Sequence, residues 1–337
     1  MPAGTAAIAF FSLLAIQTSV ALVFKFSQTN GKYEFFTSSA QTSAEVFKLA
    51  LSVLLFARDR SRRNGDEKPG EAPAGFAEDL ATQLNFRLVT QCGFLAALYC
   101  LNNQLAFVIF RWADAASITL IKSASSFVSA LFLWLLLQRP VNHLQWISIC
   151  IQVLGLVVVQ YDDCKKSTLL PATTYAALLV SLCISSAAGV WNEHLLKTFS
   201  ASLHAQNMCM YVYGVIFNVL IFLLWEKPAE EVLSSSLWFR GYSVGAVGII
   251  TCQAVLGLAV TAVLKFADTV VRSLASACSV SILYVANIVL FGWAVNLTYV
   301  TGCCIVFLST YLYMAVSKVN LQPPETKAAV QKTTETE

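Results

Sequence analysis

Four ionisable side chains lie inside otherwise apolar stretches of the sequence: Glu45, Lys48, Lys122 and Arg272. A charge in the hydrocarbon core of a bilayer costs at least about 3 kcal/mol, so each is a candidate site residue. Lys48, Lys122 and Arg272 together would bind an anionic solute, because both cation types hold phosphate through charge-assisted hydrogen bonds. Glu45 lies three residues before Lys48 and is expected to pair with it rather than to contact a ligand. For Arg272, extension of the side chain to the membrane surface is the alternative.

Amide and phenol side chains in the same stretches could supply further contacts. Asn102 and Asn103 lie in one stretch, and Asn207 and Tyr211 lie in another. Amides can bind a base edge or sugar hydroxyls, and a tyrosine ring can stack on a base. The alternative is that the amides join helices to one another, at under about 2 kcal/mol each. For Asn103 both interpretations stay open.

The remaining reactive residue types predict no second site. The chain has three His and ten Cys, with no CxxC pair and no zinc-ligand spacing. The sequence also lacks HExxH, P-loop and G-x-S-x-G motifs. We therefore expect no metal site, no cofactor and no enzymatic activity.

The elements that must position these residues are transmembrane helices. The 337 residues are 57% hydrophobic and 12% charged, about half the charged fraction of a soluble domain. This composition indicates that the lipid bilayer surrounds the chain. The net charge of +3 is too small to indicate a nucleic-acid partner. A bilayer core needs about 20 apolar residues per helix. Ten runs meet this template, near 5–25, 35–56, 88–110, 115–137, 144–161, 172–193, 206–225, 241–263, 270–292 and 296–316.

Lys and Arg residues set the expected orientation of these spans. Most of them fall in the loops that are cytosolic if the N-terminus is cytosolic, so both termini are predicted to face the cytosol. Residues 58–87 form the one long polar cytosolic loop, and residues 317–337 form a cytosolic tail. Both segments are too polar to pack and are expected to be disordered.

A short motif occurs twice and suggests an internal repeat. Arg111-Trp112-Ala113-Asp114 and Lys265-Phe266-Ala267-Asp268 each precede an apolar helix. Five predicted spans separate the two motifs, and an odd number reverses their direction through the membrane. Chance recurrence is the alternative. The pattern predicts an all-α membrane protein whose single domain, 1–316, has inverted five-helix repeats at about 1–161 and 172–316, as in alternating-access carriers.

The sequence resembles the Golgi nucleotide-sugar transporters, in the branch that carries CMP-sialic acid, UDP-galactose and UDP-N-acetylglucosamine. The residues that carry the resemblance are Glu45-Val46-Phe47-Lys48-Leu49, Tyr99-Cys100-Leu101-Asn102-Asn103-Gln104, Asp114-Ala115-Ala116, Leu144-Gln145-Trp146-Ile147-Ser148, Gly189-Val190-Trp191-Asn192-Glu193, Gln206-Asn207-Met208-Cys209-Met210-Tyr211 and Lys265-Phe266-Ala267-Asp268. The resemblance implies a ten-helix antiporter in the Golgi membrane that exchanges a cytosolic nucleotide sugar for a lumenal nucleoside monophosphate.

The sequence departs from the family pattern after Asp114. The family usually has a lysine at the position of Ser125, whereas this chain has Lys122 three residues earlier; Arg272 keeps the later cation. A UDP-sugar is the favoured substrate, with a CMP-sugar as the alternative. The departures also leave open a carrier of another organic anion, or a transport-deficient scaffold or regulator. Whether the chain forms a homo-oligomer or a complex with glycosyltransferases is left open.

Overall fold

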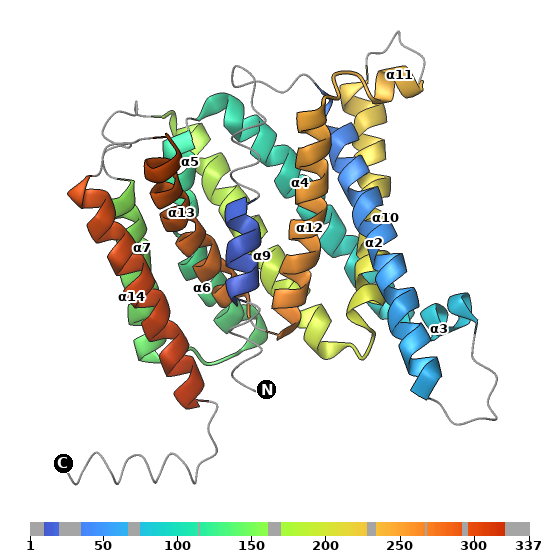
Figure 1. Cartoon of the computed structure of the whole chain (residues 1–337), viewed down its shortest axis with the longest axis horizontal. Helices are drawn as coiled ribbons and strands as arrows, with labels where there is room; N and C mark the ends of the chain where they lie inside the picture. The colour runs from blue at the N-terminus through green and yellow to red at the C-terminus, as the bar shows by residue number, and fades with distance from the viewer. Residues whose placement is uncertain are drawn as a thin grey trace.

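The computed structural model describes residues 10–19, 35–66, 75–113, 115–160, 170–227, 234–266, 268–291 and 296–320. Within these residues every regular element is a helix, and the long helices lie side by side in one bundle (Figure 1). A first helix, Phe10–Ser19, is followed by α2 (Thr37–Asp66), α3 (Phe76–Gln83), α4 (Phe86–Trp112), α5 (Ala115–Lys122), α6 (Ser125–Leu137), α7 (His143–Val159), α9 (Ala172–Thr198), α10 (Leu203–Ile221), η1 (Phe222–Glu226), α11 (Ser235–Trp238), α12 (Val244–Phe266), α13 (Thr269–Phe291) and α14 (Leu297–Asn320).

Several of these helices, alone or joined across the short turn between α5 and α6, are long and apolar enough to cross a membrane. Seven meet this criterion by length and composition among the described residues, and an eighth is added if α3 and α4, which meet at an 82° bend, count as one span. The first and fifth predicted spans appear as shorter apolar helices, Phe10–Ser19 and His143–Val159. Large apolar side chains on the outer face of the bundle, such as Leu154 and Leu308, are exposed, as expected for a surface that meets lipid.

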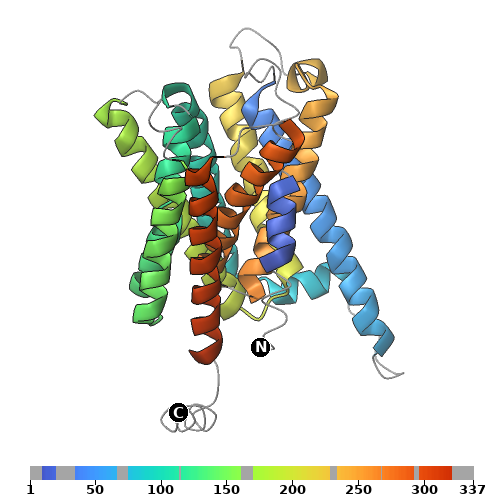
Figure 2. The ribbon, with the colours of Figure 1, turned by 60° about the vertical axis from the view of Figure 1, so that its left-hand side comes forward.

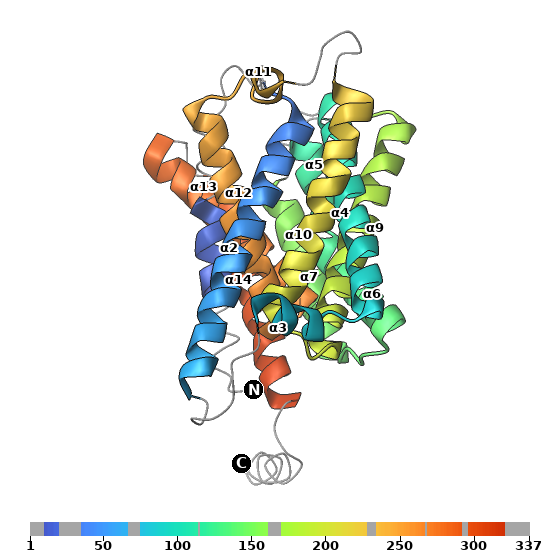
Figure 3. The same ribbon diagram turned by 90° about the vertical axis from the view of Figure 1, so that its right-hand side faces the viewer.

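The prediction that residues 58–87 do not pack is wrong for the part of this segment that the structure describes. Helix α2 continues to Asp66, and α3 forms from Phe76 to Gln83. The ring of Phe76 packs edge-on against Phe56, with 5.3 Å between centroids, and Leu80 joins the same apolar cluster. Helix α3 lies across one end of the bundle, at the opposite end from α11 (Figure 3). Its acidic pair, Glu78-Asp79, lies between two apolar pairs, and the average composition of the segment therefore concealed the helix.

The fourth predicted span, 115–137, is interrupted. Helix α5 ends at Lys122, and a turn at Ser123 and Ala124 separates it from α6. The Ser123 hydroxyl donates a hydrogen bond to the carbonyl of Leu120 at 2.5 Å, which provides a polar partner where the helix breaks. Lys122 is therefore the last residue of α5, and the candidate membrane span Leu120–Leu137 runs across this turn.

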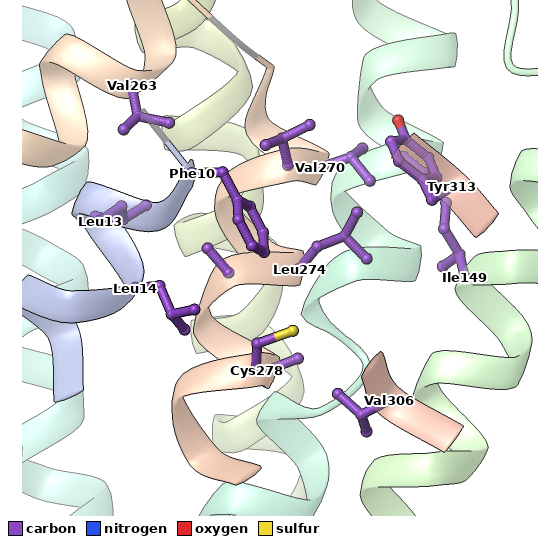
Figure 4. Packing of buried hydrophobic residues seen from close by; sticks show 14 of the residues in the cluster. Phe10, Leu13, Leu14, Ile149, Val263, Val270, Leu274, Cys278, Val306 and Tyr313 are labelled. Atoms are coloured by element: carbon purple, nitrogen blue, oxygen red, sulfur yellow. The ribbon is translucent and has the colours of Figure 1, made fainter. Parts of the chain in front are cut away.

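One apolar core is built around α13. Phe10, Leu13 and Leu14 of the first helix point toward Leu274 and Cys278 of α13 (Figure 4). A polar contact fixes the same two helices, because the Gln17 amide donates to Ser276 at 3.0 Å and accepts from Ser279 at 3.1 Å. A second core joins α4, α9 and α10. Helix α9 contributes residues to both cores and so joins them.

Helices α7 and α14 pack closely along their lengths (Figure 2). A methyl group added at Gly302 would lie 2.7 Å from the Val159 backbone nitrogen and 2.9 Å from the Gly155 carbonyl. A methyl group added at Gly155 would lie 2.8 Å from Cγ2 of Ile305. The two glycines thus allow the backbones to approach, as small residues do between membrane helices.

Candidate functional site

A cavity of about 390 Å³ lies between α2, α4, α9, α10, α12 and α13. This volume is within the range of small-molecule sites. Its charged and polar lining residues are Glu45, Lys48, Tyr99, Asn103, Asn192, Tyr211, Asn218, Gln253, Thr261 and Arg272. Five of the eight residues predicted from the sequence are therefore brought together here: Glu45, Lys48, Asn103, Tyr211 and Arg272.

Lys48 is held by neighbours on three helices. Its Nζ lies 2.5 Å from Oε1 of Glu45, so the predicted pairing is confirmed. The same Nζ lies 4.9 Å from the ring centroid of Tyr211, a cation–π contact. Two glycines make room for the pair: a methyl group at Gly257 would lie 2.8 Å from Cδ of Lys48, and one at Gly214 would lie 3.0 Å from Oε2 of Glu45.

Arg272 lines the cavity near the beginning of α13. Its Nε is buried and has no hydrogen-bond partner among the described residues. The guanidinium passes close to Gly189 of α9, where an added methyl group would lie 3.0 Å from its Nη2. The side chain is thus directed into the protein rather than extended to the membrane surface. Lys48, Arg272 and Glu45 together make the formal charge of the cavity positive.

The other three predicted residues lie outside the cavity lining. Asn207 is buried behind it and donates from Nδ2 to Oγ1 of Thr261 at 3.1 Å, so it orients a hydroxyl that does line the cavity. Oδ1 of Asn102 accepts a hydrogen bond from Ser181 of α9 at 3.0 Å. Lys122 lies at the end of α5 with an exposed side chain.

Sequence reasoning missed several lining residues. Tyr99 lies one turn before Asn103, and its hydroxyl accepts a hydrogen bond from Nδ2 of Asn192 at 3.2 Å. Gln253 and Thr261 lie two turns apart on α12, with Gly257 between them. This spacing of four residues places the three residues on one helix face. The spacing is the feature of the sequence from which Gln253 and Thr261 could have been predicted as lining residues.

Glu193 organises the end of the cavity nearest to Arg272. Its side chain is fully buried, and Oε1 accepts hydrogen bonds from Arg139 and Lys197, both at 2.8 Å. Its Oε2 accepts from the backbone nitrogen of Thr269 at 2.7 Å and from the Thr269 hydroxyl at 2.9 Å. A carboxylate at the N-terminus of α13 is favoured by the helix dipole. Glu193 therefore fixes the turn of α13 that carries Arg272.

Comparison with known proteins identifies the family. The family model for nucleotide-sugar transporters matches residues 5–314. The chain belongs to the nucleotide-sugar transporter family. The resemblance predicted from the motifs is thus confirmed, and this family member is a multi-pass membrane transporter rather than an enzyme.

Relatives of this nucleotide-sugar transporter occur in plants. The chain is 25% identical over 304 residues to CMP-sialic acid transporter 2 of Oryza sativa, covering 90% of this chain and 82% of that protein. It is 27% identical over 308 residues to CMP-sialic acid transporter 4 of Arabidopsis thaliana, covering 90% and 83%. A solved crystal structure is 12% identical, with a TM-score of 0.66 over 95% of this chain and 99% of that one. This last likeness shows the fold alone.

Proposed function

We propose that the protein is a Golgi antiporter that exchanges a cytosolic nucleotide sugar for a lumenal nucleoside monophosphate by alternating access. The observation that carries the proposal is the Arg272 guanidinium, whose Nε is buried beside the cavity without a hydrogen-bond partner among the described residues. A cation at this depth is costly unless an anion accompanies it. A phosphate group supplies that anion, because guanidinium binds it through paired charge-assisted hydrogen bonds.

Different residues of the cavity contact different parts of the substrate. Arg272 and Lys48 contact the phosphates, and Glu45 holds Lys48 in place before the substrate arrives. Two cations in one cavity match a diphosphate, which favours a UDP-sugar; the names of the plant relatives make a CMP-sugar the alternative. Tyr211, whose buried ring lies against Lys48, positions the ammonium group beside the substrate. Asn207 orients Thr261, and Asn103 contacts the substrate directly. Asn102 supports the packing of α4 against α9.

The helix contacts support ten spans in two inverted repeats. Helices α2 and α10, α6 and α13, and α7 and α14 pack together in pairs, and each pair joins spans that are five positions apart in the predicted order. The pairing of α2 with α12 likewise has a counterpart in the pairing of α10 with α4. Such a pattern is typical of carriers whose site lies between two repeats. The excess of Lys and Arg in one set of loops supports cytosolic termini.

The experiment that tests this proposal is a thermal-unfolding panel on the purified full-length protein. UMP or CMP at about 100 times its Kd should raise the stability by about 2.7 kcal/mol. Arg272→Ala should abolish this shift, whereas Arg87→Ala, which removes an exposed charge at the start of α4, should retain it. No shift with any nucleoside monophosphate would contradict the proposal and favour a scaffold or regulator.

Lys122 stays a predicted phosphate contact, although it is not a lining residue of the cavity. Because alternating access rearranges the helices around the site, the predicted role is tested by transport rather than by binding alone. Lys122→Ala should abolish exchange in liposomes while the protein remains folded. Unchanged exchange would remove Lys122 from the site.

A further inference from the structure

We propose that Gln253 of α12 and Asn103 of α4 bind the sugar of the substrate, and that this sugar is an uncharged, hydroxyl-rich pyranose. The inference rests on the proposed function. It assigns a direction to the substrate in the cavity, with the phosphates toward Arg272 and the sugar at the opposite end. It also assigns a specificity-determining role to Gln253.

The cavity has two ends that differ in their side chains. Thr261 lies five residues before the end of α12, and Arg272 lies three residues after the beginning of α13, so both are close to the α12–α13 connection. Gln253 lies eight residues before Thr261 on the same helix, a distance of about 12 Å along the axis. The cavity therefore extends from an end near Arg272 to an end near Gln253.

Asn103 belongs to the same end as Gln253. Tyr99, one turn earlier on α4, bonds Asn192, the neighbour of Glu193, and so lies toward the Arg272 end. The next residue after Asn103, Gln104, donates to the hydroxyl of Ser38 at 3.2 Å. Ser38 is the second residue of α2, and Lys48 follows it ten residues later. Asn103 thus lies beyond Lys48, on the side away from Arg272.

The amides of Asn103 and Gln253 make no hydrogen bond with any residue that the structure describes, although both line the cavity. Asn218, the third amide at this end, differs because its Nδ2 donates to the Gly214 carbonyl at 2.8 Å and its Oδ1 accepts from Sγ of Cys100 at 3.6 Å. A polar group left unpaired within a membrane protein is costly. Asn103 and Gln253 therefore supply two amide groups for a ligand.

The position of the aromatic rings indicates a sugar rather than a base at this end. An amide provides two donors and one acceptor, which suits either the hydroxyls of a sugar or the edge of a base. A base also gains from stacking on an aromatic ring. Of the lining rings, Tyr211 is buried against Lys48, and Tyr99 lies at the Arg272 end beside Asn192. The base is accordingly placed near Tyr99, and the sugar near the amides.

The charges of the lining indicate that the sugar is uncharged. Glu45 precedes Lys48 on α2 and lies on the Gln253 side of it. Lys48 and Arg272 are the cations among the described lining residues, and both are assigned to the phosphates. A carboxylate on the sugar would meet Glu45 and would find no cation of its own at this end. A hexose or N-acetylhexosamine avoids this repulsion.

The test compares a nucleotide sugar with the nucleotide alone. Dissociation constants of UDP-galactose and UMP are measured on the full-length protein in nanodiscs, with CMP-sialic acid and CMP as a parallel pair. Gln253→Ala and Asn103→Ala should each weaken UDP-galactose binding about tenfold and leave UMP binding within about twofold. The retained UMP binding also shows that each variant is folded. Gln104→Ala, which removes the adjacent amide outside the cavity, should change neither constant.

Several results would overturn the inference. Equal losses for UMP and UDP-galactose would mean that the amides contact the nucleotide, and unchanged constants would mean that they contact neither group. A third variant tests the charge: Gln253→Lys should raise CMP-sialic acid binding relative to CMP by about tenfold, and an unchanged ratio would contradict the assignment of this end to the sugar. If wild-type protein binds neither UMP nor CMP, the proposed function itself fails.

Discussion

Lys48 shows how small residues place a charge at the site. Its ammonium group contacts the carboxylate of Glu45 and the ring of Tyr211, and its stem packs against Gly257 of α12. A larger residue at position 257 would occupy the space that the Lys48 stem now fills. The geometry of the cation therefore depends on a residue that cannot contact a phosphate itself.

Substitution of this glycine tests that dependence. In Gly257→Ala the new methyl group would lie 2.8 Å from Cδ of Lys48, and the flexible side chain must move. The free energy of unfolding should change little, whereas UMP binding should weaken about tenfold because the ammonium is displaced. Gly93→Ala is the control, since its methyl group would contact Tyr213 outside the cavity. Equal binding by both variants would show that the position of Lys48 is unimportant.

Glu193 gives a second prediction at the residue scale. Glu193→Gln keeps the shape of the side chain but removes the charge that pairs with Arg139 and Lys197. Because Glu193 is fully buried, we expect a loss of about 2 kcal/mol in the free energy of unfolding, measured by thermal melting. Arg139→Ala should cost less, since Arg139 is half-exposed and Lys197 remains. An unchanged melting temperature for Glu193→Gln would contradict the role assigned to this carboxylate.

Residue spacing predicted some of these contacts and could not predict others. The Glu45–Lys48 pair follows from a separation of three residues on one helix. The hydrogen bond between Asn207 and Thr261 joins α10 to α12, and no spacing within either helix shows which helices are neighbours. Glu193 is the last residue of the predicted span 172–193, and its position there does not indicate which other helices it contacts. Its partners come from α13, from the segment after α6 and, through Lys197, from its own helix.

At the scale of elements, the pairing of α7 with α14 depends on backbone contact at Gly155 and Gly302. Gly302→Ala would place a methyl group 2.7 Å from the Val159 backbone nitrogen, and the backbone cannot rotate away as a side chain can. We expect a loss of about 2 kcal/mol in the free energy of unfolding. Gly75→Ala should have little effect, because its nearest new contact is at 4.0 Å. Equal melting temperatures for the two variants would show that close packing here is unimportant.

Element boundaries were predictable where polarity changes sharply. The apolar run 172–193 became α9, which continues by one more turn to Thr198. The break between α5 and α6 falls at a short group of small and polar residues, Ser123 to Ser126, inside the predicted run 115–137. Hydropathy averaged over the whole run did not locate it. Helix α7 has 17 residues, a length of about 26 Å, which is shorter than a bilayer core of about 30 Å. The fifth predicted span therefore fails the length criterion although its residues are apolar.

At the scale of the whole molecule, composition and the length of the apolar runs predicted a helical membrane protein, and the structure and the family agree. The site was only partly predictable. Charges inside apolar runs identified Lys48, Glu45 and Arg272, because such charges are rare and costly. The neutral residues Gln253, Asn192 and Thr261 line the same cavity, but neutral polar residues are common in membrane helices and carry no comparable signal.

The central claim is that this cavity exchanges a nucleotide sugar for a nucleoside monophosphate. Its most direct test is counterflow: purified protein in liposomes preloaded with UMP or CMP, or left empty, is given radiolabelled UDP-galactose or CMP-sialic acid outside. We predict that at least one preloaded nucleotide stimulates uptake of its nucleotide sugar about tenfold over empty liposomes, and that Arg272→Ala removes the stimulation. Equal uptake into preloaded and empty liposomes, or full stimulation in Arg272→Ala, would contradict the account.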